Sequence, residues 1–235
     1  MFAFTIKAFA STASFRIPEN HTFQQTLPLP PVTTLTGLMG AAMGLDIEAA
    51  MNFRADNKIS FGVSATYKGE LRDLWKYNKV KTKETLKDVL IREFLVDYEL
   101  TLVIASKDEK ALSEINGAFG DPKYALTLGN SDDLLKIRRI GNIVTAQQSQ
   151  STDFENTVLP DIRAFEYESM IDLKDTPITY RVRAPQIYLL PTAFSFTVRQ
   201  RRVSKREHFI FVGSPIRLKN PITAYTIDDL QVVLL

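Results

Sequence analysis

The chain has 235 residues, of which 45% are hydrophobic and 24% are charged. This balance is typical of a soluble globular protein and excludes a disordered chain, and no apolar run approaches the roughly 20 residues that a membrane-spanning helix needs. The absence of cysteine excludes disulfides, thiolate metal sites and cysteine nucleophiles and favours the cytoplasm, while a formal net charge of +2 does not by itself indicate a nucleic-acid partner.

The N-terminal part is predicted to form a strand, a long loop and a helix. Residues 2–9 alternate large apolar residues with other types, which predicts a strand with one buried face rather than a secretion signal. Residues 11–31 are polar and rich in proline, so they predict a long loop, and long ordered loops tend to be functional. Thr33 or Thr34 is expected to cap a helix that ends near Gly44.

The predicted helix has an unusual surface. Small residues at helical spacing leave one face nearly smooth, and they are Gly37, Gly40, Ala41 and Gly44. Glycine inside a helix costs about 1 kcal/mol relative to alanine. We therefore expect another backbone to approach this face closely, either a strand or a bound ligand.

The middle of the chain continues the alternation of strands and helices. Strands are predicted at 58–67 and 92–106, a helix at 108–119, and a last element at 137–145. The order strand, helix, strand, strand, helix, strand predicts an α+β, ferredoxin-like fold, in which two helices cover one face of a four-stranded antiparallel sheet.

The helical period disappears after about residue 150. Short β-rich runs alternate there with prolines, which predicts a small all-β region. We therefore expect a ferredoxin-like domain over residues 1–150 and a β-rich C-terminal region over residues 151–235.

Few residues are available for catalysis. The only histidines, His21 and His208, cannot form a metal-binding cluster, and Asp132 and Asp133 are adjacent and point in different directions, so neither a metal nor a cofactor is expected. Phosphate-binding, dinucleotide-binding and nucleophile-elbow motifs are absent. One enzymatic class stays open, the metal-free cleavage of RNA, with His21 as its candidate base.

Two basic segments carry aromatic residues, which together can contact phosphates and bases. The first, 72–92, contains Trp75 and Tyr77, and the second spans 181–206. A solvated, lysine-rich surface is the alternative explanation for both.

Two segments resemble the fifth family of CRISPR-associated (Cas) proteins, a member of the RAMP superfamily. The first has an aromatic residue and an arginine in the loop, then Pro-x-x-Thr-x-x-Gly-Leu-x-Gly-Ala from Pro31 to Ala41. The second, residues 124–133, is similar to a Leu-Gly-(Arg/Lys)-Ser-(Asp/Glu) segment, although Asn130 stands where the family usually has a basic residue.

The resemblance implies a non-catalytic subunit that grips the 5′ handle of CRISPR RNA (crRNA) at one end of a type I, I-B-like, Cascade complex. It also implies a thumb inserted between the second and third strands, here residues 68–92, which contacts the neighbouring backbone subunit. The other implied partners are the large subunit and, through the assembled complex, target DNA.

The candidate RNA-binding residues lie in the loop, at the helix start, in the thumb and in the second motif. They are Phe15, Arg16, His21, Thr22, Gln24, Thr33, Thr34, Lys68, Trp75, Lys76, Tyr77 and Ser131. We leave open whether the later basic residues face target DNA, the large subunit or water, and these are Arg199, Arg201, Arg202, Lys205 and Arg206.

Two alternatives remain at this point. In the type I-C branch of the family the protein itself matures the repeat RNA with a Tyr, Lys and His set, but we find no Lys-His pair after the third strand. The chain could also be an unrelated ferredoxin-like interaction protein, because a fold does not define a function.

Overall fold

The computed structural model describes most of the chain. The described residues are 1–20, 23–80, 85–162, 165–172, 174, 177, 181–198 and 200–235. Strands predominate among them, with helices α1 to α3, so the expected α+β class is confirmed.

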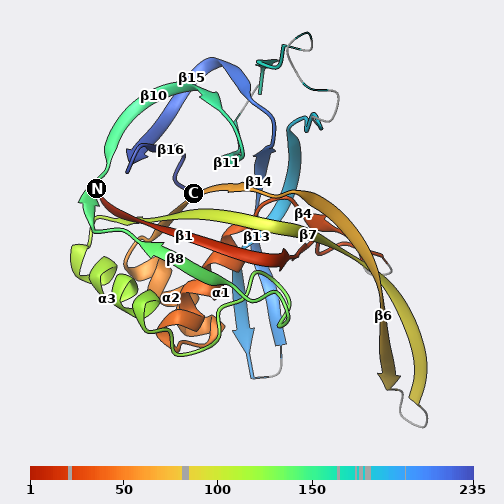
Figure 1. The fold of residues 1–235 in the computed structure, drawn as a ribbon. Helices are drawn as coiled ribbons and strands as arrows, with labels where there is room; N and C mark the ends of the chain where they lie inside the picture. Colours follow the sequence, from red (N-terminus) through yellow and green to blue (C-terminus); the bar gives the residue numbers. More distant parts are fainter. Residues whose placement is uncertain are drawn as a thin grey trace.

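A large antiparallel sheet forms the centre of the molecule (Figure 1). Its middle follows the order β5-β7-β1-β8, with bounds Ser60–Thr66, Thr85–Ser106, Phe2–Ala13 and Lys136–Ile140. The strands predicted at 2–9, 58–67 and 92–106 are confirmed, but β1 and β7 are longer than expected. The predicted last element divides into β8 and the short β9 (Val144–Thr145), which also pairs with β1.

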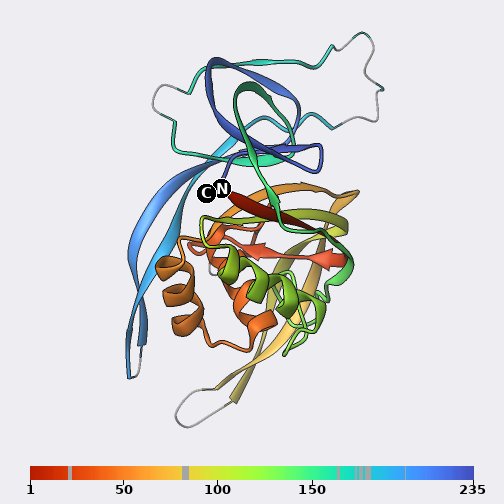
Figure 2. The same cartoon turned by 90° about the vertical axis from the view of Figure 1, so that its left-hand side faces the viewer.

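The three helices cover one face of this sheet, as Figure 2 shows. They are α1 (Val32–Met43), α2 (Ile47–Asp56) and α3 (Glu109–Gly120). The helix α2 was not predicted, because Ala50 is its only fully buried residue and it therefore lacks an apolar stripe. Its first turn is capped by Asp46, whose carboxylate accepts a hydrogen bond from the N–H of Ala49 at 2.8 Å.

Apolar side chains fill both sides of the main sheet. On the helix side, Phe4, Phe61 and Leu102 pack with Leu35 and Leu112 in one core. Each is almost fully removed from water, which is the main force that holds the helices on the sheet.

The opposite face carries a second sheet. It contains β10, β15, β12 and β16, with bounds Gln147–Phe154, Ile216–Ile227, Tyr167–Ser169 and Leu230–Val232. Ala3 and Val103 of the main sheet pack with Ile227 and Val232 of the second. A Cβ on Gly62 would lie 2.5 Å from Cγ2 of Val232, so only glycine allows the two sheets to approach this closely.

The C-terminal part is rich in strands, as expected, but three of them extend the main sheet beyond β5. They are β11 (Thr157–Pro160), β14 (Gln200–Val212) and β13 (Gln186–Thr197). The expected boundary near residue 150 falls inside β10. The division into residues 1–150 and 151–235 stays a prediction.

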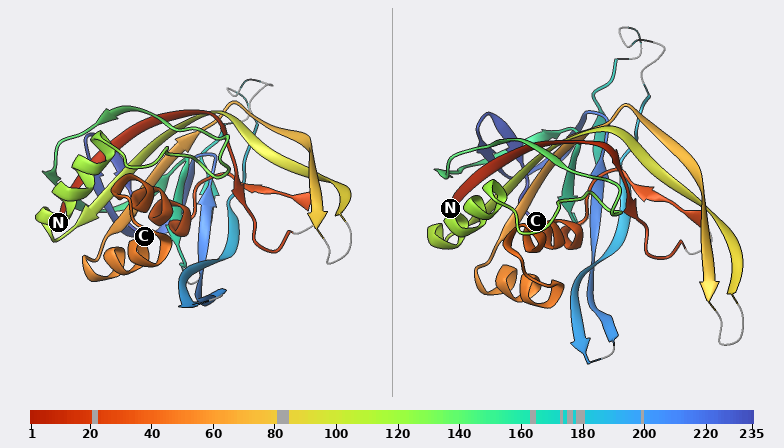
Figure 3. Two further views of the ribbon diagram at one scale, coloured as in Figure 1. Left: turned by 90° about the horizontal axis from the view of Figure 1, so that it is seen from below. Right: turned by 60° about the horizontal axis from the view of Figure 1, so that its bottom comes forward.

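Two long ribbons project from the body on the side of the helices (Figures 1 and 3). In the first, β6 (Gly69–Val80) pairs with the N-terminal half of β7, from Gly69↔Val96 to Val80↔Thr85. The second consists of β13 and β14.

The loop after β1 lies between the ribbons (Figure 3). It was expected to be irregular from residue 11, but β1 continues to Ala13 and three two-residue strands follow, β2 (Phe15–Arg16), β3 (Phe23–Gln24) and β4 (Thr26–Leu27). The strand β3 pairs in parallel with β7, which attaches this loop to the first ribbon.

Candidate nucleic-acid interface

The helix α1 starts without the expected threonine cap. Its N-cap is Pro31, with no side-chain hydrogen bond, and the carbonyl oxygen of Pro31 accepts from the N–H groups of Thr34 and Leu35 at 2.9 and 3.1 Å. Proline suits this position because its fixed φ leads into the helix and it has no N–H to leave unpaired. The capping role expected for Thr33 or Thr34 is therefore wrong.

Thr33 and Thr34 instead line a groove of about 430 Å³. Its walls come from α1, α2, the segment around Gly129 and the second ribbon, with Gly37, Thr127, Phe194 and Arg201 among the lining residues. A Cβ built on Gly37 would meet no atom within 4 Å apart from the nearby backbone of α1 and the two adjacent residues. This part of the helix therefore faces open space. The leading turn of α1 is thus accessible from the groove.

The other helix glycines have separate explanations. A Cβ on Gly40 would lie 2.7 Å from Cβ of Ala50, so the close neighbour is the unpredicted helix α2, and the expectation of a strand or ligand at Gly40 is wrong. Gly44 ends the helix with φ 78°, in the left-handed region, as expected.

The second ribbon contributes aromatic and basic groups to the groove. The guanidinium carbon of Arg201 lies 4.7 Å from the ring centre of Phe194, whose ring lies 6.4 Å from that of Phe196. A cation over an aromatic face keeps both groups ordered and leaves the charge available to an anion.

Other residues of the basic run have partners of their own. Arg206 pairs with Glu19 at 2.8 Å, and Lys205 pairs with Glu207 at 2.9 Å. Arg202 donates to the side-chain oxygen of Gln200. Arg199 lies outside the described residues.

The second motif fastens the loop after β1. The N–H of Ser14 donates to the carbonyl of Leu128 at 2.9 Å, and the amide of Asn130 donates to Oγ of Ser14 at 2.9 Å. The buried carboxylate of Asp133 accepts from the hydroxyl of Thr12 at 2.6 Å and the N–H of Asn130 at 3.1 Å. Asn130 is thus engaged within the fold, whereas Ser131 is exposed.

Arg92 connects the same motif to the first ribbon. Its Nη2 lies 2.9 Å from Oδ2 of Asp73 and 3.4 Å from Oδ2 of Asp132. The hydrogen bonds that Arg92 donates to Asp73 are the main reason that the pKa of Arg92 is raised. Sequence reasoning did not single out Arg92, although the hairpin register that places it opposite Asp73 was a possible signal.

The first ribbon presents two stacked aromatic rings. Trp75 and Tyr77 lie 6.0 Å apart, and the guanidinium of Arg92 lies 5.8 Å from the Trp75 ring centre. The tryptophan is 46% exposed, so the pair offers a flat surface to a ligand.

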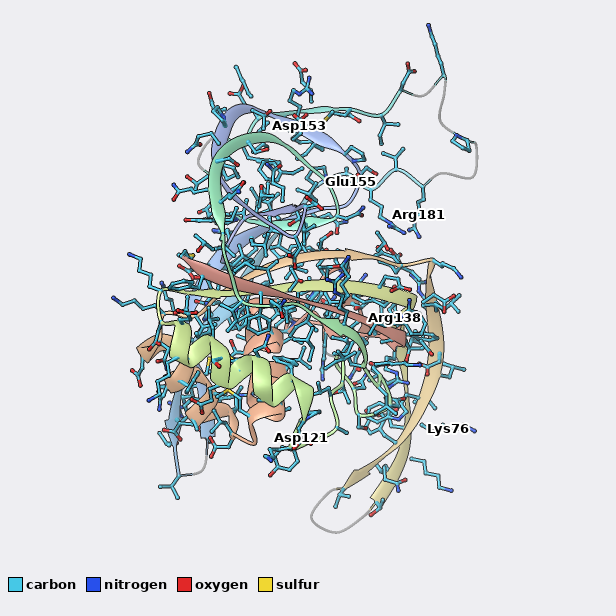
Figure 4. All side chains as sticks on the ribbon, turned by 60° about the vertical axis from the view of Figure 1, so that its left-hand side comes forward. Lys76, Asp121, Arg138, Asp153, Glu155 and Arg181 are labelled. Carbon is cyan, nitrogen blue, oxygen red and sulfur yellow. The ribbon has the colours of Figure 1, made fainter. Side chains whose placement is uncertain are left out.

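The two lysines predicted in the thumb lie at different places on the ribbon. Lys68 pairs with Asp97 at 3.0 Å at its base. Lys76 is exposed farther along and projects away from the ribbon (Figure 4).

The residues predicted in the loop are not brought to one surface. Phe15 is only 1% exposed and packs edge-on against Tyr98 at 5.5 Å, so its ring is part of the core and no face of it is open to a base. Arg16 is exposed on β2, and Gln24 is half-buried opposite Arg92. His21 and Thr22 lie outside the described residues.

Two features are absent from the described residues. None of the helices there is long and apolar enough to cross a membrane. In the same part of the chain, no group of three His, Cys, Asp or Glu residues could hold a metal ion.

The fold is similar to that of two solved structures of CRISPR proteins. A chain of a "CRISPR RNA-guided surveillance complex" superposes with a TM-score of 0.54 at 15% identity, over 91% of each chain. A "CRISPR protein from Archaeoglobus fulgidus" superposes with a TM-score of 0.53 at 12% identity, over 99% of this chain and 98% of the other. The fold is therefore one that CRISPR proteins adopt.

The family follows from the sequence. The family described as "CRISPR-associated protein (Cas_Cas5)" matches residues 4–206. The chain belongs to this family, and the resemblance inferred from the two motifs is confirmed. No curated protein matches the chain.

Proposed function

We propose that this Cas5-family chain is a non-catalytic subunit of a type I, I-B-like CRISPR surveillance complex, in which it binds and caps the 5′ handle of crRNA. The observation that carries the proposal is the open groove at the start of α1, where Gly37 leaves room and Arg201 supplies a cation. Family membership supports a role in CRISPR defence, and the fold is shared with a chain of an RNA-guided surveillance complex.

The groove has the chemistry that a single-stranded RNA end needs. The first turn of a helix presents N–H groups and the positive end of the helix dipole, both of which favour phosphate. Thr33 and Thr34 add hydroxyl groups that can bond to phosphate oxygens or to a 2′-hydroxyl. Phe194 adds an aromatic face beside the cation of Arg201.

We assign the ribbon of β6 and β7 as the family's thumb. The order β5-β7-β1-β8, all antiparallel, supports a ferredoxin-like core, and the ribbon lies between β5 and the C-terminal half of β7 in the chain, two strands that are neighbours in this order. Trp75 and Tyr77 then form the stacking surface against the guide, and the ribbon beyond them contacts the backbone subunit. The partners on this proposal are crRNA, the backbone and large subunits, and target DNA through the complex, all in the cytoplasm.

Co-expression of the chain with the other subunits and a crRNA tests the proposal. We expect the guide to stay with the complex after purification in high salt, and to lose its protected 5′ handle when this chain is left out. Incubation of the purified chain with repeat RNA in EDTA should give no cleavage. Specific cleavage in EDTA would show a metal-independent ribonuclease and overturn the non-catalytic assignment.

A further inference from the structure

A second cavity, of about 650 Å³, lies apart from the groove at α1. It is enclosed by the loop after β1, the base of the first ribbon and the segment that leads into β13. Among the lining residues are Gln25, Tyr67, Arg72, Arg183, Gln186 and Tyr188. Its volume is within the range of about 300–1,000 Å³ that is usual for small-molecule sites.

Flat groups form part of the wall. The guanidinium carbon of Arg183 lies 3.9 Å from the ring centre of Tyr67, and Tyr188 packs edge-on against Phe211 at 5.3 Å. Burial raises the pKa of Tyr67, so its hydroxyl stays neutral and donates to Glu70 at 2.9 Å. The ring of Tyr67 also stacks with Tyr98 at 6.1 Å, so the guanidinium of Arg183 and the ring of Tyr188 are the flat groups left for a planar ligand.

The charges of the cavity are mostly paired. Arg72 lies 2.9 Å from Glu93, and Arg181, labelled in Figure 4, lies 3.2 Å from Glu70. Arg183 pairs with no carboxylate in the described part of the chain. A phosphate-binding site would need several unpaired cations, so this lining suits a neutral polar ligand better.

Arg183 also has an unused donor. Its Nε is buried and has no hydrogen-bond partner among the described residues. The backbone of Arg183 is fixed, because its N–H donates to Oγ of Ser214 at 2.8 Å. The neighbouring segment also packs closely, since a Cβ built on Gly213 would lie 2.6 Å from the Cβ of Arg183. Buried donors are normally satisfied, so a small rotation of this side chain toward the cavity would let Nε meet an acceptor there.

We propose that this cavity receives one unstacked nucleobase of the bound RNA. The inference rests on the proposed function, because the strand must already lie on the loop and the first ribbon for one of its bases to enter. A base stacks on tyrosine and guanidinium faces, and its edge offers both donors and acceptors. Oε1 of Gln25 already accepts from Asn20 and Oε1 of Gln186 already accepts from Tyr188, so these two side chains offer their NH2 groups as donors. The guanidinium of Arg183 adds further donors for a ring nitrogen or carbonyl of the base.

A scan with abasic RNA tests the inference on the full chain. The probes are copies of the repeat RNA of the host's CRISPR array, each with a single abasic position, and the readout is the dissociation constant. We expect one position at which loss of the base weakens binding by about tenfold. That penalty should disappear in Gln186→Ala and in Tyr188→Ala.

Ile187→Ala is the matched control, because Ile187 lies between these residues on β13 and is 57% exposed outside the cavity. It should keep the penalty. If Tyr188→Ala unfolds, Gln186→Ala decides, since Gln186 is exposed and its truncation removes no core contact.

RNA binding without any position-specific penalty, or with a penalty that both cavity variants keep, would overturn the inference and leave the proposed function standing. Failure to bind any of the RNAs would instead overturn the proposed function, and the base pocket with it.

Discussion

A Cβ on Gly129 would lie 1.7 Å from the carbonyl oxygen of Ser14. The glycine also has φ 119°, in the region that side chains rarely adopt. Residues more than a hundred positions apart thus meet backbone to backbone, and this contact holds the loop after β1 beside the groove. The second family motif therefore has a structural role in addition to any contact that Ser131 makes.

Gly129→Ala should destabilise the protein by at least about 2 kcal/mol, because both backbone strain and a clash oppose the new methyl group. Urea unfolding measures the effect. Gly117→Ala is the control, since no atom lies within 4 Å of a Cβ at that helical position, and there we expect no loss or a gain of up to about 1 kcal/mol. Equal effects from the two substitutions would contradict the contact.

If the proposed function holds, Arg201→Ala should weaken RNA binding and reduce the salt slope of the binding constant by about one unit, because the cation beside Phe194 would no longer neutralise a phosphate. Arg202→Ala is a matched control, since Arg202 is next on the same strand and its guanidinium donates to Gln200. Binding constants of wild type and both variants, measured at several salt concentrations, give the slopes to be compared. A smaller effect from Arg201→Ala than from Arg202→Ala would place the RNA on the other face of the ribbon.

Arg16→Ala should also weaken handle binding and lower the slope by about one unit, since Arg16 is exposed on β2 between the two ribbons. The same salt titration tests it. An unchanged slope would remove Arg16 from the interface.

Trp75→Ala should reduce RNA affinity by about tenfold through loss of base stacking. Leu74→Ala serves as the comparison, because Leu74 is 69% exposed on the same strand and has no aromatic ring. Fluorescence of the single tryptophan gives a second readout, and we expect it to be quenched when RNA stacks on Trp75. Unquenched fluorescence at saturating RNA would rule out stacking there.

Asp153 provides a prediction about acid stability. The hydrogen bond from Arg217 lowers the pKa of its carboxyl from 3.8 to about 2. Because the folded pKa is depressed, the ionised form stabilises the fold above the unfolded pKa, and this contribution is lost as the pH falls from about 4 through about 2. Asp153→Asn should therefore make the urea midpoint less dependent on pH in that window, whereas Asp121→Asn, at a carboxylate that is 94% exposed, should leave it unchanged. The same pH dependence in wild type and Asp153→Asn would contradict the assignment.

Much of the fold could be predicted because alternating patterns state directly which side of a strand is buried. Phe4, Ile6 and Ala8 occupy every second position of β1, and all three lie in the core. The expectation that β1 has only one buried face is wrong, because the second sheet also covers Ala3 and Thr5 on the other side. The helix end at Gly44 was equally clear, since a left-handed residue there favours glycine. The family motif around α1 also identified a surface that proved to be open at Gly37.

What the amino-acid order alone determined, then, was the type of each strongly periodic element and the family. Only the tertiary structure decided that Phe15 is enclosed while Arg201 faces the groove, and that Gly40 makes room for α2. It also brought Gln25, Tyr67 and Arg183 to one cavity. The physical reason is that periodicity reports which side of an element is buried, whereas a site depends on the register and twist that bring distant segments together, and no local pattern specifies these.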